Sequence, residues 1–240
     1  KLNKITPFIA LAVFFSLAGL RAQEVASIEH DTDYGHYNSL VQVDADTYVL
    51  AYQGRSQDGF ISTFTVSADG TSITEVDQLE HDGVFAQHCS MVHVYGDTYV
   101  LAYNGNSYDG FISTFTIDGD GNITAVKTES EGNNLEHDTG RGAFNSLIQV
   151  DSDTYVLAYQ GGDFDGWIST FTISSDGATI TEVATLEFYE ADSDDNGQND
   201  MVEGNSLVQV DADTYALTYG VQVGLYEHYG YITTFTIPTD

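Results

Sequence analysis

Hydrophobic and polar residues alternate along a stretch that the chain repeats four times. In its first copy Tyr48, Leu50 and Tyr52 alternate with Val49 and Ala51, which is the period of two that a β-strand requires. Residues typical of turns, mainly Gly and Asp, separate one such run from the next. The strands predicted for the first copy span about 39–43, 47–53, 59–66 and 72–79. Each repeat is therefore predicted to form one four-stranded antiparallel sheet.

An Asp-Thr-Tyr string marks the repeat and recurs 51 to 60 residues apart, at Asp46, Asp97, Asp153 and Asp213. Four-stranded sheets repeated at this spacing are typical of β-propeller blades. The repeats span about 38–88, 89–144, 145–204 and 205–240. We predict an all-β fold, a four-bladed β-propeller. In organisation the repeats resemble bacterial secreted β-propeller arrays over nearly the whole chain after residue 22, without the signatures of WD40 or kelch blades.

The last repeat has no sequence for a fourth strand after Ile237. A matching segment lies near the other end of the chain, where residues 24–30, EVASIEH, resemble residues 75–81, EVDQLEH. Pairing of residues 24–30 with the last repeat would close the propeller and remove its open edges. We expect this closure; the alternative is a fragment of a longer array.

Residues 1–22 differ from the rest of the chain. Lys1 and Lys4 precede an apolar run that ends in Leu20-Arg21-Ala22, which is the pattern of a secretory signal peptide. We predict a single domain over residues 23–240 that is secreted or displayed at the cell surface, with an uncleaved anchor as the alternative. No later segment is apolar enough to span a membrane. With Cys89 as the only cysteine, no disulfide forms within the chain.

The chain is strongly acidic, with a formal net charge of −31. Such a charge repels nucleic acid and anionic membranes and attracts cations. A surface that serves only to keep the protein soluble is the alternative for most of these carboxylates.

One loop carries a candidate cation site. Residues 192–203 resemble the calcium loop of the EF-hand family, with oxygen-bearing side chains at alternate positions and Gly197 at the sharp turn. The resemblance implies calcium as a cofactor, held by Asp192, Asp194, Asn196, Gln198, Asp200 and Glu203. Asn199 departs from the apolar residue usual in that family, and the flanks are predicted strands, so a calcium switch is not expected. The alternative is an acidic, solvated insertion.

Two repeated polar features have structural and functional interpretations. His30, His81 and His137 each stand between Glu and Asp; we expect packing between blades, with zinc binding as the alternative. A serine begins each inner strand, and we expect hydrogen bonds that fix the loops, with an ion or a sugar hydroxyl as the alternative ligand. These serines are Ser39, Ser90, Ser146 and Ser206.

Aromatic residues also lie in the loops between strands two and three and between blades, which share one face. Rings beside Asp, Asn and Gln suit carbohydrate, because a sugar offers an apolar face for stacking and hydroxyls for hydrogen bonds. The candidate ligand-binding residues are Tyr34, Tyr37, Phe85, Tyr108, Phe164, Tyr226 and Tyr229.

These features predict a secreted, calcium-stabilised binding or adhesion module for an extracellular glycan or a surface protein. One alternative is a polysaccharide-acting enzyme, a hydrolase or lyase that uses loop carboxylates as acid and base. Another is a structural subunit of an extracellular assembly. The sequence assigns no catalytic residue, because no nucleophile or phosphate-binding motif is present.

Overall fold

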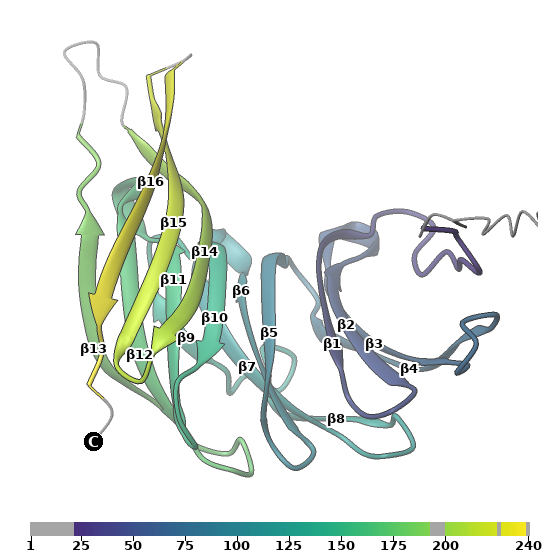
Figure 1. The fold of residues 1–240 in the computed structure, drawn as a ribbon. Coiled ribbons are helices and arrows are strands. Elements are labelled where there is room, and N and C mark those ends of the chain that lie inside the picture. Colours follow the sequence, from purple (N-terminus) through teal and green to yellow (C-terminus); the bar gives the residue numbers. More distant parts are fainter. Residues whose placement is uncertain (1–21, 193–199, 225–226, 239–240) are drawn as a thin grey trace, which may run out of the picture.

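The computed structural model describes residues 22–192, 200–224 and 227–238, which form four antiparallel sheets (Figure 1). Sheet 1 contains β1 (His36–Gln42), β2 (Thr47–Gln53), β3 (Gly59–Val66) and β4 (Ile73–Asp82). Sheet 2 contains β5 (Gln87–Tyr95), β6 (Thr98–Asn104), β7 (Gly110–Ile117), β8 (Ile123–Lys127) and β9 (Leu135–Asp138). Sheet 3 contains β10 (Ala143–Gln149), β11 (Thr154–Gln160), β12 (Gly166–Ile173) and β13 (Ile180–Tyr189). Sheet 4 contains β14 (Met201–Asp211), β15 (Thr214–Val223) and β16 (Glu227–Thr236).

Strands adjacent in sequence pair within each sheet, which confirms the predicted antiparallel repeat. Short 3-10 turns, η1 (Arg55–Gln57), η2 (Asn106–Tyr108) and η3 (Gly162–Phe164), join the second and third strands of the first three sheets. In sheet 2 the outer strand is divided, because β8 and β9 both pair with β7 and residues 128–134 intervene. The all-β prediction is confirmed, and the arrangement is β-propeller-like.

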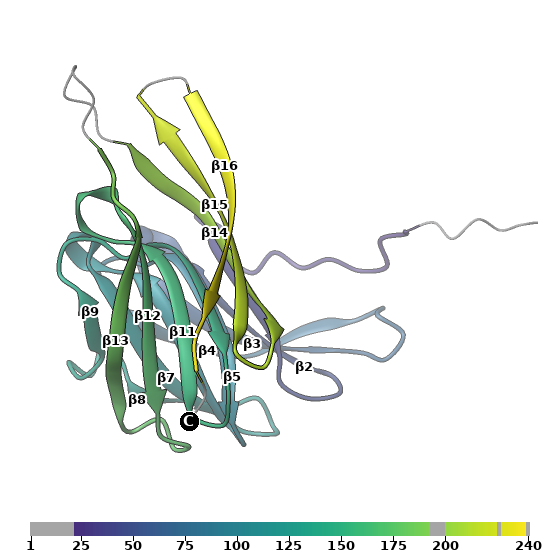
Figure 2. The same cartoon turned by 60° about the vertical axis from the view of Figure 1, so that its left-hand side comes forward.

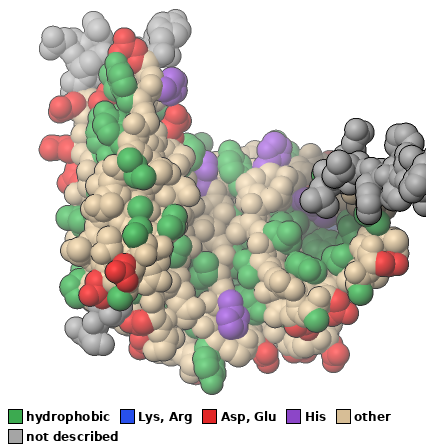
Figure 3. Space-filling model, in the orientation of Figure 1, with side chains coloured by type: hydrophobic (Ala, Val, Ile, Leu, Met, Phe, Trp, Pro, Cys, Tyr) green, Lys and Arg blue, Asp and Glu red, His purple; other side chains and the backbone are tan. Residues whose placement is uncertain are grey.

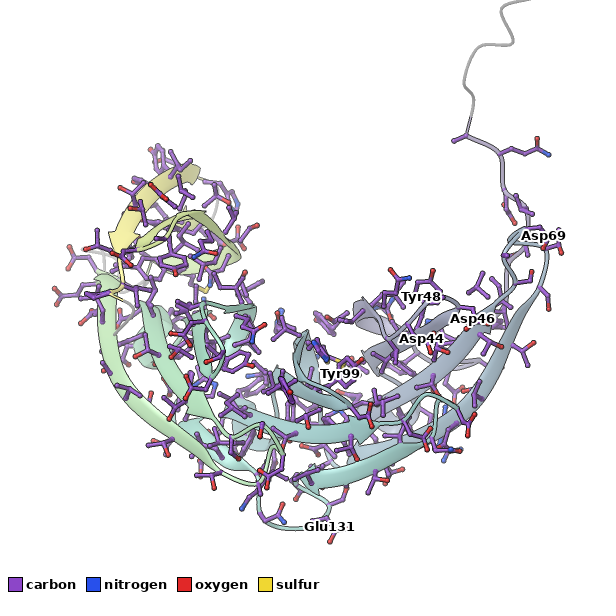
Figure 4. The ribbon with its side chains drawn as sticks, turned by 60° about the horizontal axis from the view of Figure 1, so that its bottom comes forward. Asp44, Asp46, Tyr48, Asp69, Tyr99 and Glu131 are labelled. Atoms are coloured by element: carbon purple, nitrogen blue, oxygen red, sulfur yellow. The ribbon has the colours of Figure 1, made fainter. Side chains whose placement is uncertain are left out.

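Hydrophobic side chains pack each sheet against the next. Tyr99, Leu101 and Phe115 of sheet 2, for example, contact Val49 and Ile61 of sheet 1. Equivalent clusters join sheets 2 and 3 and sheets 3 and 4. The four sheets follow one another along an open arc, with sheets 1 and 4 at its two ends (Figure 4).

The predicted closure of this arc is not observed. Residues 24–30 form no strand, and sheet 4 has three strands among the described residues, with β16 at its edge. The physical reason is the curvature of the arc, which keeps sheets 1 and 4 apart at its two ends (Figure 4), while the ring of His30 packs edge-on against Tyr52 of sheet 1, with centroids 4.7 Å apart. Residues 24–30 therefore stay beside sheet 1 and away from β16.

The histidines of the repeated triplets have the structural role that we expected. His81 is fully buried, and both ring nitrogens of the partly buried His137 are also shielded from solvent. The two rings lie edge-on to Tyr103 and Tyr159 of the following sheets, at 4.8 and 4.7 Å. Burial lowers the pKa of both imidazoles to about 3, so they are neutral at physiological pH. In the described residues no group of three or more His, Cys, Asp or Glu side chains is placed to hold a metal ion.

The loops gather at one end of the sheets, as the strand alternation predicts. Hydrogen bonds join the connections that enter sheets 2 and 3 to a 3-10 turn of the preceding sheet: Ala86 N–H donates to Gln57 O at 3.0 Å, and Gly142 N–H donates to Tyr108 O at 2.9 Å. Strands β14, β15 and β16 project beyond the others at this end (Figures 1 and 2). Within the described ranges, no helix is long and apolar enough to cross a membrane.

Candidate functional site

A row of aromatic rings crosses the loop-bearing end of the inner strands. Tyr37 of β1 lies 4.6 Å from His88 of β5, and His88 lies 4.3 Å from Phe144 of β10, measured between ring centroids. We call these three residues the aromatic row. Histidine side chains are visible along this upper edge of the molecule (Figure 3).

Each residue of the aromatic row occupies a β-bulge. The pairing of β1 with β2 shifts between His36 and Ser39, and the same shift recurs in sheets 2, 3 and 4. The bulge gives Tyr37, His88 and Phe144 positive φ angles of 56°, 52° and 54°. Large side chains rarely adopt this left-handed conformation, which costs on the order of 1–3 kcal/mol and is concentrated at functional sites.

Side-chain hydrogen bonds from the next sheet hold the bulges at His88 and Phe144. Asn145 Nδ2 donates to His88 O, and Asn205 Nδ2 donates to Phe144 O, each at 3.1 Å. Three of the inner-strand serines accept a backbone N–H from the following sheet: Ser39 from Met91, Ser90 from Leu147 and Ser146 from Leu207, at 2.9–3.0 Å. These three serines have a structural role, but their bonds join the inner strands of adjacent sheets and do not fix the loops as we expected. The rings are therefore set on a rigid backbone.

Sheet 4 departs from this pattern and opens the end of the row. The fourth position is Gly204, with φ of 65° and no atom within 4 Å of where a Cβ would stand. Its neighbour Glu203 is paired with Gly220, where the other sheets have Gln53, Asn104 or Gln160. Without a side chain at Gly220, the Glu203 carboxylate lies above it, with Oε1 3.7 Å from the ideal Cβ position.

Glu203 immediately precedes Gly204 at the bulge of sheet 4. The equivalent positions in the other sheets are His36, Gln87 and Ala143. Glu203 Oε1 lies 3.1 Å from Nδ1 of His228 on β16, and both side chains are partly exposed. The site thus combines a row of mutually tilted aromatic rings, an open space at Gly204 and an accessible carboxylate.

A second aromatic cluster lies further out on the same face. The guanidinium of Arg141 stands over the rings of Tyr108 and Phe164, at 5.6 and 5.0 Å from their centroids, and Arg141 Nε donates to Gln160 Oε1. Phe85 packs edge-on against Tyr108 at 5.5 Å. Burial, and then the charge of Arg141, lower the pKa of His88 to about 4, so His88 presents a neutral ring at neutral pH.

The structure divides the predicted ligand-binding residues into three groups. Tyr34 and Tyr37 flank His36 at the start of the aromatic row, 5.5 and 6.2 Å from its ring. Phe85, Tyr108 and Phe164 form the outer cluster around Arg141. Tyr229 stands apart on β16, where its hydroxyl donates to Glu227 Oε2 at 2.8 Å. Tyr226 lies outside the described residues.

The calcium loop stays a prediction, because Asp194, Asn196 and Gln198 lie outside the described residues. Two of its predicted ligands, Asp192 and Asp200, are joined by a backbone hydrogen bond, in which Asp200 N–H donates to Asp192 O at 3.0 Å. Asp200 is buried, and its Oδ2 accepts a hydrogen bond from the Tyr189 hydroxyl at 2.9 Å.

The sequence interpretation missed His88, Phe144 and Arg141 as members of the site. A signal for the first two was present, because the motif Tyr37-Asn38-Ser39 returns as Phe144-Asn145-Ser146 and, with changes, as His88-Cys89-Ser90. Nothing in the sequence indicated that Arg141 would lie between two rings from different loops.

The sequence matches no protein family and no curated protein. The structure is similar to an endo-arabinase from Bacteroides thetaiotaomicron, with a TM-score of 0.54 and 10% identity over 84% of this chain and 75% of that one. It is also similar to a putative 6-phosphogluconolactonase from Bacteroides uniformis, with a TM-score of 0.54 and 13% identity over 84% and 57% of the two chains.

A third similar structure is a bifunctional GH43-CE protein of Bacteroides eggerthii, with a TM-score of 0.51 and 13% identity. The match covers 89% of this chain but only 28% of that protein. At these identities the likeness shows the fold alone: the chain has an all-β, β-propeller-like structure.

Proposed function

We propose that the protein acts on an extracellular polysaccharide, which it holds on the aromatic row and hydrolyses next to Glu203. The observation that carries the proposal is the strained row of Tyr37, His88 and Phe144, which ends at the open space beside a carboxylate. Sugar rings stack on aromatic faces, and the glycosidic bond next to the last stacked ring would reach Glu203.

Glu203 has the chemistry of a general acid or base for this reaction. In hydrolysis, water adds across the glycosidic C–O bond, and a carboxylic acid protonates the leaving oxygen or a carboxylate removes a proton from water. His228, in contact with Glu203 Oε1, would orient that carboxylate as a positioning residue. The names of two similar structures, the endo-arabinase and the GH43-CE protein, favour an enzyme over a binding module.

The second candidate is a glycan-binding or adhesion module without catalysis, as the sequence suggested. The observation in its favour is that the aromatic row is repeated from sheet to sheet, which suits the binding of successive sugars along a chain. Both candidates use the same face and the same ligand class, and they differ only in the fate of the glycosidic bond.

Two variants separate the candidates when incubated with a panel of polysaccharides that includes arabinan. Phe144→Ala should weaken polysaccharide binding at least tenfold, while Tyr95→Ala, which removes an exposed ring from the opposite face, should leave it unchanged. Glu203→Gln should retain binding and lose release of reducing sugar. Binding without hydrolysis by the unaltered protein would favour the binding module, and binding unaffected by Phe144→Ala would refute both.

A further inference from the structure

The three interfaces between sheets are copies of one interface. In each, a bulky face of Leu or Met, Tyr and Phe side chains packs on a small face of Val, Ala and Ile side chains from the preceding sheet. All four sheets stack in the same direction. In the two internal sheets, sheets 2 and 3, both the face with bulky side chains and the face with small side chains are therefore covered. We use the names bulky face and small face for these two surfaces.

The arc therefore ends in two incompletely covered faces of opposite kind. The bulky face of sheet 1 is open at its inner strand: Tyr52 and Phe64 are buried, but Leu40 is 64% exposed. Its equivalents are almost completely buried: Met91, Leu147 and Leu207, at 4%, 4% and 6% exposed. Leu40 also lines an apolar cavity of about 250 Å³ with Leu50, Phe64 and Ile73.

Sheet 4 exposes the opposite surface, its small face. Ile232 is 73% exposed, although its equivalents are buried in every other sheet: Ile61, Ile112 and Ile168. Val208 and Val210 on β14 are also exposed. Hydrophobic side chains are visible along sheet 4 at the left of Figure 3.

Residues 24–30 lie against sheet 1 in the position of an outer strand from a preceding sheet. His30 packs on Tyr52 at 4.7 Å, just as His81, at the end of the outer strand of sheet 1, packs on Tyr103 of sheet 2 at 4.8 Å. The three inner strands of that preceding sheet are absent from this end of the described chain.

A second contact places residues 24–30 in the same position. Val25 lies 3.9 Å from the ideal Cβ position of Gly70, in the β3–β4 turn. Val76 of β4 meets the equivalent Gly121 of sheet 2 at 3.2 Å. Both ends of residues 24–30 are thus arranged as in a completed interface.

Sheet 4 has the complementary deficiency. The outer edge of β16 is unpaired among the described residues, and a cavity of about 560 Å³ lies between it and β13, lined by Val183, Leu186 and Phe235. The strand that fills this place in sheet 3 includes EVATLEF at residues 182–188, which closely resembles EVASIEH at residues 24–30.

We propose that a second copy of this chain docks head-to-tail, with its bulky face on the small face of sheet 4 and its residues 24–30 paired with β16. The open arc separates the two surfaces within one molecule (Figures 1 and 4), so one copy supplies each half. The internal interfaces also specify polar contacts: Ser206 Oγ would accept the backbone N–H of the second copy's Leu40, as Ser146 accepts that of Leu207.

Charge and symmetry shape this association. The two surfaces differ, so the contact is heterologous and leads either to a closed ring or to a growing filament. Each copy carries a net charge of −31, which opposes association at low salt. Because salt screens that repulsion over about 10 Å at 0.1 M, the assembly should be favoured at higher ionic strength.

Light scattering coupled to size-exclusion chromatography tests the proposal on the chain without residues 1–22 and on three variants. Leu40→Asp and Ile232→Asp should each reduce the mass to that of a monomer, because each damages one face. Mixing the two variants should restore a dimer, because one retains the small face and the other the bulky face. Tyr95 is 68% exposed and belongs to neither the bulky face nor the small face, so Tyr95→Asp should leave the assembly intact. A monomeric parent protein, or no dimer on mixing, would overturn the proposal.

Disulfide trapping tests the strand itself. If residues 24–30 pair as β13 pairs with β12, where Thr185 faces Ser169, then Ser27 of one copy faces Thr233 of the other. Mixed Ser27→Cys and Thr233→Cys proteins should form a cross-linked dimer on mild oxidation, and a mixture of Ser27→Cys with Tyr95→Cys should not. Burial raises the pKa of Cys89 to about 12, so the native thiol does not compete. A third protein carries Ser27→Cys and Thr233→Cys in one chain. An internal cross-link in this double variant, without cross-linked dimers, would show closure within one chain and refute the proposal.

Discussion

Mild acid should destabilise the protein through two buried histidines. The ring nitrogens of His81 and His137 are buried, and burial lowers the pKa of each imidazole from 6.5 to about 3. In the unfolded chain each imidazole binds a proton near pH 6.5, whereas in the folded protein it stays neutral. Stability is therefore greatest above pH 6.5 and falls as the pH drops from 6.5 towards 3, because the unfolded state binds more protons.

The magnitude follows from proton linkage. One pH unit below the unfolded pKa costs about 1.4 kcal/mol for each histidine, so the two together remove about 3 kcal/mol at pH 5.5 relative to pH 7.5. His88, whose pKa is lowered to about 4, adds a loss of the same sign. The carboxyl groups with lowered pKa values, such as Asp69 with a pKa of about 2, lose their contribution only at more acidic pH.

A matched replacement for these histidines is present in the chain itself. Phe188 occupies the equivalent position and packs on Tyr219 at 4.8 Å, so phenylalanine fits this place in the repeat. Urea unfolding at pH 7.5 and 5.5 should show that His81→Phe/His137→Phe loses about 3 kcal/mol less than the parent protein, with an unchanged m-value. Exposed His93→Gln is the control. An equal loss in the parent and the double variant would refute the reasoning.

Three further perturbations have defined outcomes. Gly110→Ala should lower the free energy of unfolding by urea by about 1–3 kcal/mol, because a Cβ would stand 2.6 Å from the His137 ring. Gly119→Ala is the control and should be close to neutral, since no atom lies within 4 Å of its Cβ position. Equal effects of the two changes would contradict this account. Ser146→Ala should cost about 1 kcal/mol, since the buried N–H of Leu207 loses its acceptor, and an unchanged unfolding midpoint would show that the bond contributes nothing. Calcium should raise the midpoint of thermal unfolding above its value in chelator, and Asp192→Ala should abolish that rise. A parent protein whose midpoint does not respond to calcium would refute the calcium site.

The sequence predicted the sheets well, because alternation and turn residues are local signals. The strands predicted for the first repeat agree within a few residues with β1 to β4, and the sharing of one face by the loops is confirmed by the hydrogen bond from Ala86 to Gln57. Closure was not predictable in this way. Residues 24–30 resemble an outer strand in sequence. Whether they reach β16 depends on the curvature of the arc, which is determined by how the sheet faces pack.

The candidate site was predicted only in part, because its geometry comes from the bulges. Tyr37 was selected as a loop aromatic, whereas His88 and Phe144 become its neighbours only because each adopts a positive φ angle at a register shift. Glu203 was predicted as a calcium ligand, and the described contacts place it beside His228. Two measurements on Glu203→Gln will distinguish a calcium ligand from a catalytic carboxylate: the effect of calcium on its thermal unfolding, and its hydrolysis of polysaccharide.

The most direct test of the proposed function is a crystal structure of Glu203→Gln with an oligosaccharide from the polysaccharide that the protein binds most tightly. The account predicts sugar rings stacked over Tyr37, His88 and Phe144, with a glycosidic oxygen within hydrogen-bond distance of the residue 203 amide. An oligosaccharide bound away from this row would contradict it.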